Sequence, residues 1–442
     1  MNQYDDTKDA ARCLPFKKLT LVCAAASVLL SGCGGSSSSP GDMEGRHLDS
    51  DVETEGRLVV FDQDSAAVKV LDLDTEEVLS MHPLSGEAPR LYASPDKRYA
   101  VIIQRSDGLV SFLDSGLYTE DHGDHLHDYV EDPTLLSFSL SGSKPTHYTP
   151  HEDHAAIFFD GLEGVTSSVM LLSDASIGAG DIVGELSLSN NMHGAAKLID
   201  EQLFTTYRDP SITETTLPAA VERYSFSDGA LTFEHRYSEA CPRLHGSAAT
   251  DSFITFGCSD GVLVVDLTQT SYPAIKLSNP GSLLEDSRIG SLYSHPDVDD
   301  FVGVAKNQFF VINMNSPSDP YQELPVPDGV SRIAQGFSTH AETFYILGDD
   351  GNLYLFDVDA DWSASDPVKV MDVQTEDEVG VTPAITVSQV EDVLFILHSS
   401  GQQVLEVESQ TGEILRTINL DFTASSLAWL GLSEGHAHEH DH

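Results

Sequence analysis

The chain has 442 residues, of which 71 are acidic and 23 basic, giving a formal net charge of -48. This balance argues against nucleic acid as a partner, because phosphate binding needs basic patches. Hydrophobic residues make up 40% of the sequence, so the chain can bury a large core. The acidity indicates a solvated surface that also concentrates cations around the protein.

Residues 1–33 have the pattern of an export signal, which is set aside before the fold is considered. A lysine pair at 17–18 precedes an apolar run over 19–30, which is too short for an ordinary membrane span. The run ends in Leu30-Ser31-Gly32-Cys33, a pattern typical of bacterial lipoproteins. We therefore expect a protein at the periplasmic face of the cell envelope whose membrane contact is a lipid on Cys33. Because Gly34 follows in place of an aspartate, the outer membrane is slightly favoured; a plain signal anchor is the alternative.

The remaining sequence divides into a tether, a folded body and a tail. Residues 34–55 form a Ser- and Gly-rich, acidic tether, residues 56–432 the body, and residues 433–442 a histidine-rich tail. A repeat of roughly 45 residues runs through the body, which is typical of a β-propeller. Apolar strands alternate with tight turns such as Ser259-Asp260-Gly261 and Asp349-Asp350-Gly351. The predicted fold is therefore all-β, with almost no helix.

Counting the units favours eight blades over the alternative of seven. Opening strands are expected near residues 90, 146, 192, 244, 289, 333, 383 and 426. The last unit, 425–430, lacks its remaining strands, whereas the first segments, 57–62 and 68–73, lack an opening strand. Joining the two ends completes a blade, closes the ring and removes exposed sheet edges.

Three neighbouring units carry a histidine at one position of the repeat. The opening strands of a propeller line its central channel, and the residues at the matched register are Tyr92, His147, His193, His245, Gly290, Ala334, Ala384 and Ala428. A single histidine at such a position is more often a packed core residue, but three at one register favour a metal site. Imidazole is a usual ligand of Zn²⁺, and three leave a fourth position for water or a carboxylate. Ligand softness alone also permits copper or nickel.

Further metal-binding side chains lie in two turns and in the tail. An insertion between the third and fourth strands of one unit contains His122, Asp124, His125 and His127, which form a capture loop, a second site or simply a solvated polar loop. The turn His151-Glu152-Asp153-His154 is expected on the same face. Its Glu152 and Asp153 are candidates for the fourth ligand of the three histidines. The tail places histidines at 436, 438, 440 and 442, and we expect it to raise the local zinc supply.

The cysteines indicate one disulfide. Cys13 and Cys23 leave with the signal and Cys33 is expected to be acylated, so Cys241 and Cys258 remain. An even pair in an exported domain is most simply a disulfide. The alternative is a pair of thiolate ligands, although their spacing fits no zinc knuckle.

At four segments, 155–161, 192–195, 241–246 and 256–263, the chain resembles the periplasmic zinc metallochaperones of the AztD type, which serve ABC-type zinc importers. The similarity extends over roughly residues 55 to 430. The resemblance implies a propeller that binds Zn²⁺ through His147, His193 and His245 and passes it to a solute-binding protein. The family often carries a histidine-rich segment, in agreement with residues 121–128. The predicted lipid on Cys33 departs from the family, whose members are soluble, and would limit diffusion to the partner.

No catalytic residue is predicted. A nucleophile elbow, a phosphate loop and a dinucleotide fingerprint are all missing from a suitable context in the sequence. The expectation is therefore a protein that is not an enzyme. Two alternatives remain: a metallohydrolase in which three histidines hold a water-activating zinc, for which the sequence identifies no general base, and a protein-binding propeller with structural histidines.

Overall fold

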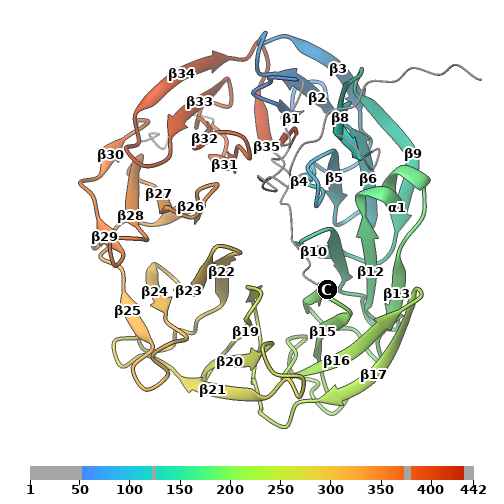
Figure 1. Cartoon of the computed structure of the whole chain (residues 1–442), viewed down its shortest axis with the longest axis vertical. Helices are drawn as coiled ribbons and strands as arrows, with labels where there is room; N and C mark the ends of the chain where they lie inside the picture. Colours follow the sequence, from blue (N-terminus) through green and yellow to red (C-terminus); the bar gives the residue numbers. More distant parts are fainter. Residues whose placement is uncertain (1–51, 122–125, 373–379, 433–442) are drawn as a thin grey trace, which may run out of the picture. The chain divides into compact units, whose positions relative to one another are not determined.

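Eight antiparallel sheets stand around a ring, with the first strand of each repeat innermost (Figure 1). The computed structural model describes residues 52–121, 126–372 and 380–432. It confirms the predicted all-β propeller and the count of eight blades over seven. The predicted signal, Cys33, most of the tether and the tail lie outside the described residues.

Each blade consists of four antiparallel strands, except that two short strands share the outer position of one blade. From the innermost strand outward, the first four blades are β35 (Ala424–Leu430), β1 (Arg57–Asp62), β2 (Ala67–Asp72) and β3 (Val78–Pro83); β4 (Arg90–Ala93), β5 (Tyr99–Gln104), β6 (Leu109–Asp114) and β9 (Thr134–Ser141); β10 (Pro145–His151), β11 (His154–Phe159), β12 (Ser168–Ser173) and β13 (Gly184–Ser187); and β14 (Ala196–Ile199), β15 (Gln202–Tyr207), β16 (Ala220–Ser227) and β17 (Ala230–Arg236). The next two blades are β18 (Ser247–Ala249), β19 (Phe253–Cys258), β20 (Gly261–Asp266) and β21 (Ala274–Ser278); and β22 (Ser291–His295), β23 (Val298–Ala305), β24 (Gln308–Ile312) and β25 (Tyr321–Glu323). The last two are β26 (Arg332–Phe337), β27 (Thr343–Gly348) and β28 (Asn352–Asp357), with β29 (Ser363–Ala364) and β30 (Val368–Lys369) both paired to β28; and β31 (Ala384–Val387), β32 (Val393–Leu397), β33 (Gln403–Glu408) and β34 (Ile414–Asn419).

The ring is closed by strands from the two ends of the chain. β35 pairs antiparallel with β1, and Leu58 stands opposite Trp429. The Trp429 side chain is 1% exposed and packs in one core cluster with Leu58, while its indole N–H donates to the Glu55 carbonyl at 2.9 Å. This is the closure that the sequence predicted, and it supplies the inner strand that the blade of β1, β2 and β3 would otherwise lack.

The middle strands of each blade are apolar on both faces because neighbouring blades cover both. In β19, Ile254 and Phe256 pack into one core cluster, whereas Val262 and Val264 of β20 pack into the cluster on the other side. The turn between them needs a glycine, since Gly261 has a φ of +149° and a Cβ there would lie 1.9 Å from the Leu277 carbonyl oxygen. Because successive side chains of a strand point to opposite faces, each middle strand packs against the neighbouring blade on either side.

Three predicted opening strands begin later in the structure than expected. Residues 192–194, 242–245 and 288–290 precede the observed strands, which begin at Ala196, Ser247 and Ser291. In the segment before Ser247 the reason is visible in the backbone, because Arg243 and Gly246 have φ angles of +53° and +79°, outside the range of regular strands. His245 therefore lies in an irregular segment just before its inner strand.

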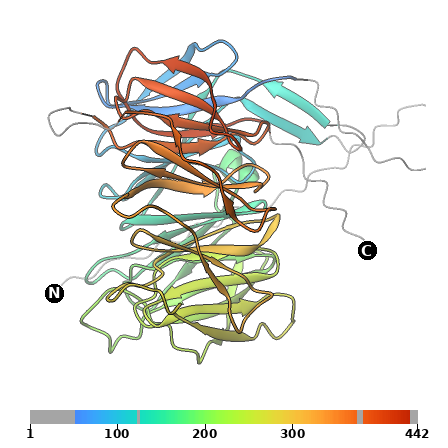
Figure 2. The same cartoon turned by 90° about the vertical axis from the view of Figure 1, so that its left-hand side faces the viewer.

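Two features depart from the regular pattern. A hairpin, β7 (Leu117–Asp121) and β8 (Leu126–Val130), lies between the third and fourth strands of its blade and stands out from the ring seen edge-on (Figure 2). The helix α1 (Asp174–Ala179) is capped by Ser173 through a capping box. Within the described ranges no helix is long and apolar enough to cross a membrane.

Candidate metal centre

The three histidines predicted at one register converge in the structure. His147 lies near the start of β10, while His193 and His245 lie just before β14 and β18, the inner strands of the next two blades. The Nε2 atom of His193 is 3.4 Å from that of His147 and 3.2 Å from that of His245. Tetrahedral Zn²⁺ with bonds of about 2.0–2.1 Å separates its ligand atoms by about 3.3–3.4 Å. The spacing of the three imidazoles therefore suits one ion bound between them.

Hydrogen bonds at the far side of two rings settle which nitrogen carries the proton. His193 donates from Nδ1 to the Asp160 carboxylate at 2.9 Å, and His245 donates from Nδ1 to the Gly290 carbonyl at 2.5 Å. A neutral imidazole has one ring proton, so both Nε2 atoms present a lone pair. Two lone pairs facing each other at 3.2 Å repel unless a cation lies between them. The arrangement is that of metal ligands oriented by their outer hydrogen bonds.

Asp160 connects His193 to an ion pair and a hydrogen bond that lie outside the three histidines. Its side chain is 5% exposed and forms an ion pair with Arg105 at 2.9 Å, while Arg105 also donates to the Thr146 hydroxyl at 2.8 Å. Sequence analysis did not assign a role to Asp160 or Arg105. The sequence feature that could have indicated Asp160 is its position at the end of the strand in segment 155–161.

Their surroundings keep the imidazoles of His147 and His245 unprotonated at neutral pH, so that they can bind a cation. Burial lowers the pKa of His147 to about 4, and the other two imidazoles add to this effect. Burial also lowers the pKa of His245, against the hydrogen bond to Gly290. Burial alone would raise the pKa of Asp160, but the hydrogen bonds from His193, Arg105 and Thr146 outweigh it and hold the pKa below its usual value. The carboxylate therefore stays charged behind His193.

Replacing Asp160 with asparagine is expected to weaken zinc binding by about 10–100-fold, because an amide holds the His193 N–H without a negative charge. The measurement is a competition titration of Zn²⁺ against a chromophoric chelator. Asp62→Asn is a matched control, since Asp62 is 2% exposed and pairs with Lys69 at 2.9 Å away from the histidines. Equal zinc affinities in the two variants would contradict a role for Asp160 in orienting the ligand.

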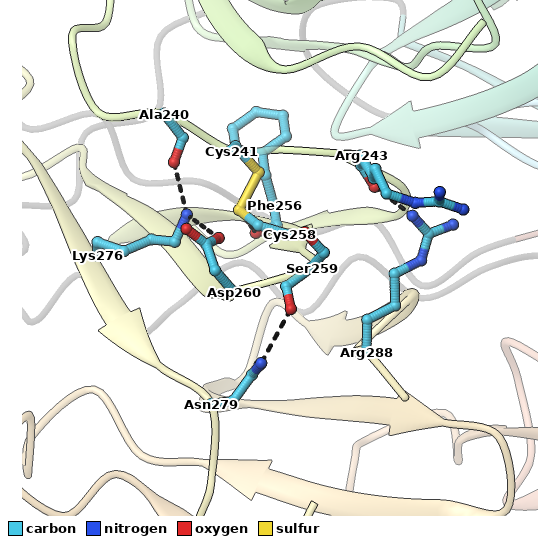
Figure 3. The surroundings of a disulfide bond; sticks show 10 residues. All are labelled: Ala240, Cys241, Arg243, Phe256, Cys258, Ser259, Asp260, Lys276, Asn279 and Arg288. Atoms are coloured by element: carbon cyan, nitrogen blue, oxygen red, sulfur yellow. Dashed lines mark hydrogen bonds and ion pairs between the residues drawn. A yellow bond between two sulfur atoms is a disulfide. The ribbon is translucent and has the colours of Figure 1, made fainter. Parts of the chain in front are cut away.

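A disulfide secures the segment that carries His245. Cys241 and Cys258 are bonded, as predicted, and neither is exposed. Figure 3 shows the bond between the segment before β18 and the end of β19. Nearby, Lys276 pairs with Asp260 at 2.7 Å and donates to the Ala240 carbonyl at 2.6 Å. The irregular segment from Cys241 to His245 is thus tied to the sheet of its own blade.

Loss of the disulfide in a Cys241→Ala, Cys258→Ala variant is expected to lower the free energy of unfolding by about 2–4 kcal/mol. The closed loop spans 17 residues, and the freed segment also makes His245 less well positioned. Urea unfolding of both proteins, with and without reductant, measures the effect. Reductant should move the wild type to the variant's midpoint and leave the variant unchanged; identical midpoints under all conditions would exclude this contribution.

The structure places the predicted fourth ligands, Glu152 and Asp153, away from the three histidines. Glu152 and Asp153 form the turn at the far end of β10, about 13 Å along the strand from His147 at about 3.3 Å per residue. Asp153 pairs with His154 at 2.5 Å, and Glu152 lies instead with His151 and Asp251. Of the insertion, His127 lies exposed on β8, whereas His122, Asp124 and His125 are outside the described residues.

Comparison with known proteins finds a relative that is similar to almost the whole chain. The zinc chaperone AztD of Citrobacter koseri is 23% identical over 400 residues, 89% of this chain and 91% of that protein. No protein-family model matches the chain. The resemblance predicted from the four sequence segments is thereby confirmed.

Solved structures agree on the fold. The crystal structure of Citrobacter koseri AztD has a TM-score of 0.71 at 22% identity, covering 86% of this chain and 99% of that one. Its apo form has a TM-score of 0.69 at 22% identity, with 84% and 96% covered. Dihydro-heme d1 dehydrogenase NirN has a TM-score of 0.57 at 12% identity, with 86% and 76% covered. Because a chaperone and a dehydrogenase share this fold, the fold alone does not assign a function.

Proposed function

We propose that this protein is a zinc carrier that holds Zn²⁺ between His147, His193 and His245 and delivers it to the solute-binding protein of an ABC-type zinc importer. The observation that carries the proposal is the approach of three Nε2 atoms at 3.2 and 3.4 Å, two of them with their lone pairs directed at each other. The similarity to a protein named as a zinc chaperone supports the choice of ion and role.

The ligand set suits transfer better than catalysis. Three neutral imidazoles leave the ion its full charge and a fourth position, to which a ligand of the acceptor can bind before the histidines release the ion. A hydrolase would use that position for water and would need a general base beside it. Asp160 is a poor base, because its contacts with His193 and Arg105 hold its pKa low. We therefore infer a carrier and not an enzyme.

The location that we propose is the periplasmic face of the cell envelope, with a lipid on Cys33 and the outer membrane favoured. The pattern Leu30-Ser31-Gly32-Cys33 supports the anchor. The disulfide between Cys241 and Cys258 suits an oxidising compartment. Labelling of cells with a radioactive fatty acid should mark the wild type and leave a Cys33→Ser variant unlabelled.

Transfer kinetics test the proposed delivery. The protein loaded with one equivalent of Zn²⁺ is mixed either with the apo solute-binding protein of the host's zinc importer or with a chelator of equal affinity. A carrier that docks should transfer zinc to its acceptor faster than zinc dissociates into the chelator, at a rate that rises with acceptor concentration. Transfer at the spontaneous dissociation rate in both cases would overturn the proposal.

A further inference from the structure

Two of the three inner strands, β10 and β18, carry metal-binding side chains at their other ends. β10 begins near His147 and ends at His151, and Glu152 follows in the turn to β11. Two blades on, Asp251 lies in the turn between β18 and β19. The inner strands run in the same direction in each blade, so these turns lie at one end of the ring and the three histidines at the other.

His151, Glu152 and Asp251 come together across that end. One nitrogen of His151 and one oxygen from each carboxylate all lie within 4.8 Å of one another. Tetrahedral Zn²⁺ with bonds of about 2.0–2.2 Å separates its ligand atoms by about 3.3–3.6 Å. Both carboxylates are on exposed residues, so small rotations of their side chains are enough to close the remaining distance.

The histidine supplies an observation independent of the acidic residues. Its Nε2 atom is buried and makes no hydrogen bond within the described part of the chain. A buried polar atom without a partner is unfavourable, because it has lost water and gained nothing. An ion bound through this Nε2 atom and the two carboxylates would remove that deficit.

We propose that His151, Glu152 and Asp251 form a second site for a divalent transition-metal ion, Zn²⁺ in the first place. One imidazole and two carboxylates are a ligand set that zinc accepts. The site binds more weakly than the three histidines, because both of its carboxylates are exposed and must be ordered on binding. It stands independently of the delivery role proposed above.

The surroundings give a hydrated ion access and a favourable field. A cavity of about 650 Å³ adjoins the cluster, and its lining includes the acidic residues Glu152, Asp153, Asp200 and Glu201. Two cations lie nearby: Lys197, whose charge acts on His151, and Arg223, which contacts Gln202 and the Tyr272 ring. The acidic side chains outnumber them, so the net field attracts cations.

The test measures zinc binding to the full chain by equilibrium dialysis. Asp251→Asn and His151→Ala should each remove one weakly bound Zn²⁺ per chain and leave the tightly bound ion unchanged. Glu285→Gln, a change at an exposed loop residue elsewhere, is the charge-matched control and should retain both ions. Because Asp251 is exposed, its variant is not expected to disturb folding, which a melting curve checks.

Cobalt spectra separate this site from the three histidines. In a His147→Ala, His193→Ala, His245→Ala background, adding Asp251→Asn should remove the absorption of one Co²⁺ ion, whereas adding Glu285→Gln should not. A weak zinc isotherm that is the same in Asp251→Asn and Glu285→Gln would overturn the second site. Failure of the carrier proposal would appear separately, as tight zinc binding that survives the triple alanine change.

Discussion

Alanine at His147, His193 and His245 together is expected to abolish high-affinity zinc binding. If about 10–16 kcal/mol of binding free energy is shared among four ligands, each contributes roughly 3 kcal/mol. One imidazole then corresponds to about a hundredfold in affinity at about 1.4 kcal/mol per factor of ten. Competition titration against a chelator of nanomolar affinity measures the loss, with each single variant placed between the wild type and the triple variant.

Three histidines outside the cluster provide the matched control. His82, His235 and His398 lie in other parts of the described chain and belong to no group of possible metal ligands there. Their triple alanine variant should bind zinc with wild-type affinity. High-affinity binding that survives the loss of His147, His193 and His245, with the fold intact by circular dichroism, would eliminate the proposed site.

Trp429→Ala is expected to lower the free energy of unfolding by about 3–5 kcal/mol. The side chain is 1% exposed and packs with Leu58 and Val60 of β1, so its removal opens a cavity at the seam that joins the two ends of the chain. Urea denaturation measures the loss. Hydrogen exchange gives a more specific outcome, since the backbone amides of β1 and β35 should exchange faster than those of the other strands of the ring.

Trp362→Ala is the control that separates the effect of ring closure from the loss of stability caused by removing any buried indole. Trp362 is 5% exposed and packs between two blades that are consecutive in the chain. Its loss should destabilise the protein by a similar amount while the seam keeps its protection. If both variants accelerate exchange of β1 and β35 equally, the seam has no special role in stability.

Much of the fold could be predicted because each blade repeats the same local signals. Paired apolar strands with Asp-Gly turns, such as Asp350-Gly351, recur often enough to count blades from sequence. The closure by β35 and β1 follows from two incomplete units, and His147, His193 and His245 stand out because they share one register. The opening strand predicted over residues 242–245 is wrong, since its place in the repeat gave no sign of the left-handed backbone at Arg243.

The parts of the two sites that could not be predicted from the sequence are contacts between residues far apart in the chain. Asp160 is recognisable as a support only when its carboxylate is seen against His193 and Arg105. Asp251 is one of 71 acidic residues in the chain and has no periodic mark that would pair it with His151. Sequence periodicity predicts which strands are equivalent, whereas the partners of a single side chain depend on how turns from different blades meet.

The closing blade also decides how the ring is attached to the rest of the chain. Arg57 at the start of β1 stands opposite Leu430 at the end of β35, so both chain ends leave the ring side by side. They leave at the end of the inner strands where His151 and Asp251 lie. The parts of the chain before Val52 and after Leu432 are therefore joined to the ring at this one end. His147, His193 and His245 lie at the opposite end of the inner strands, so the two described chain ends do not leave the ring beside the proposed metal centre.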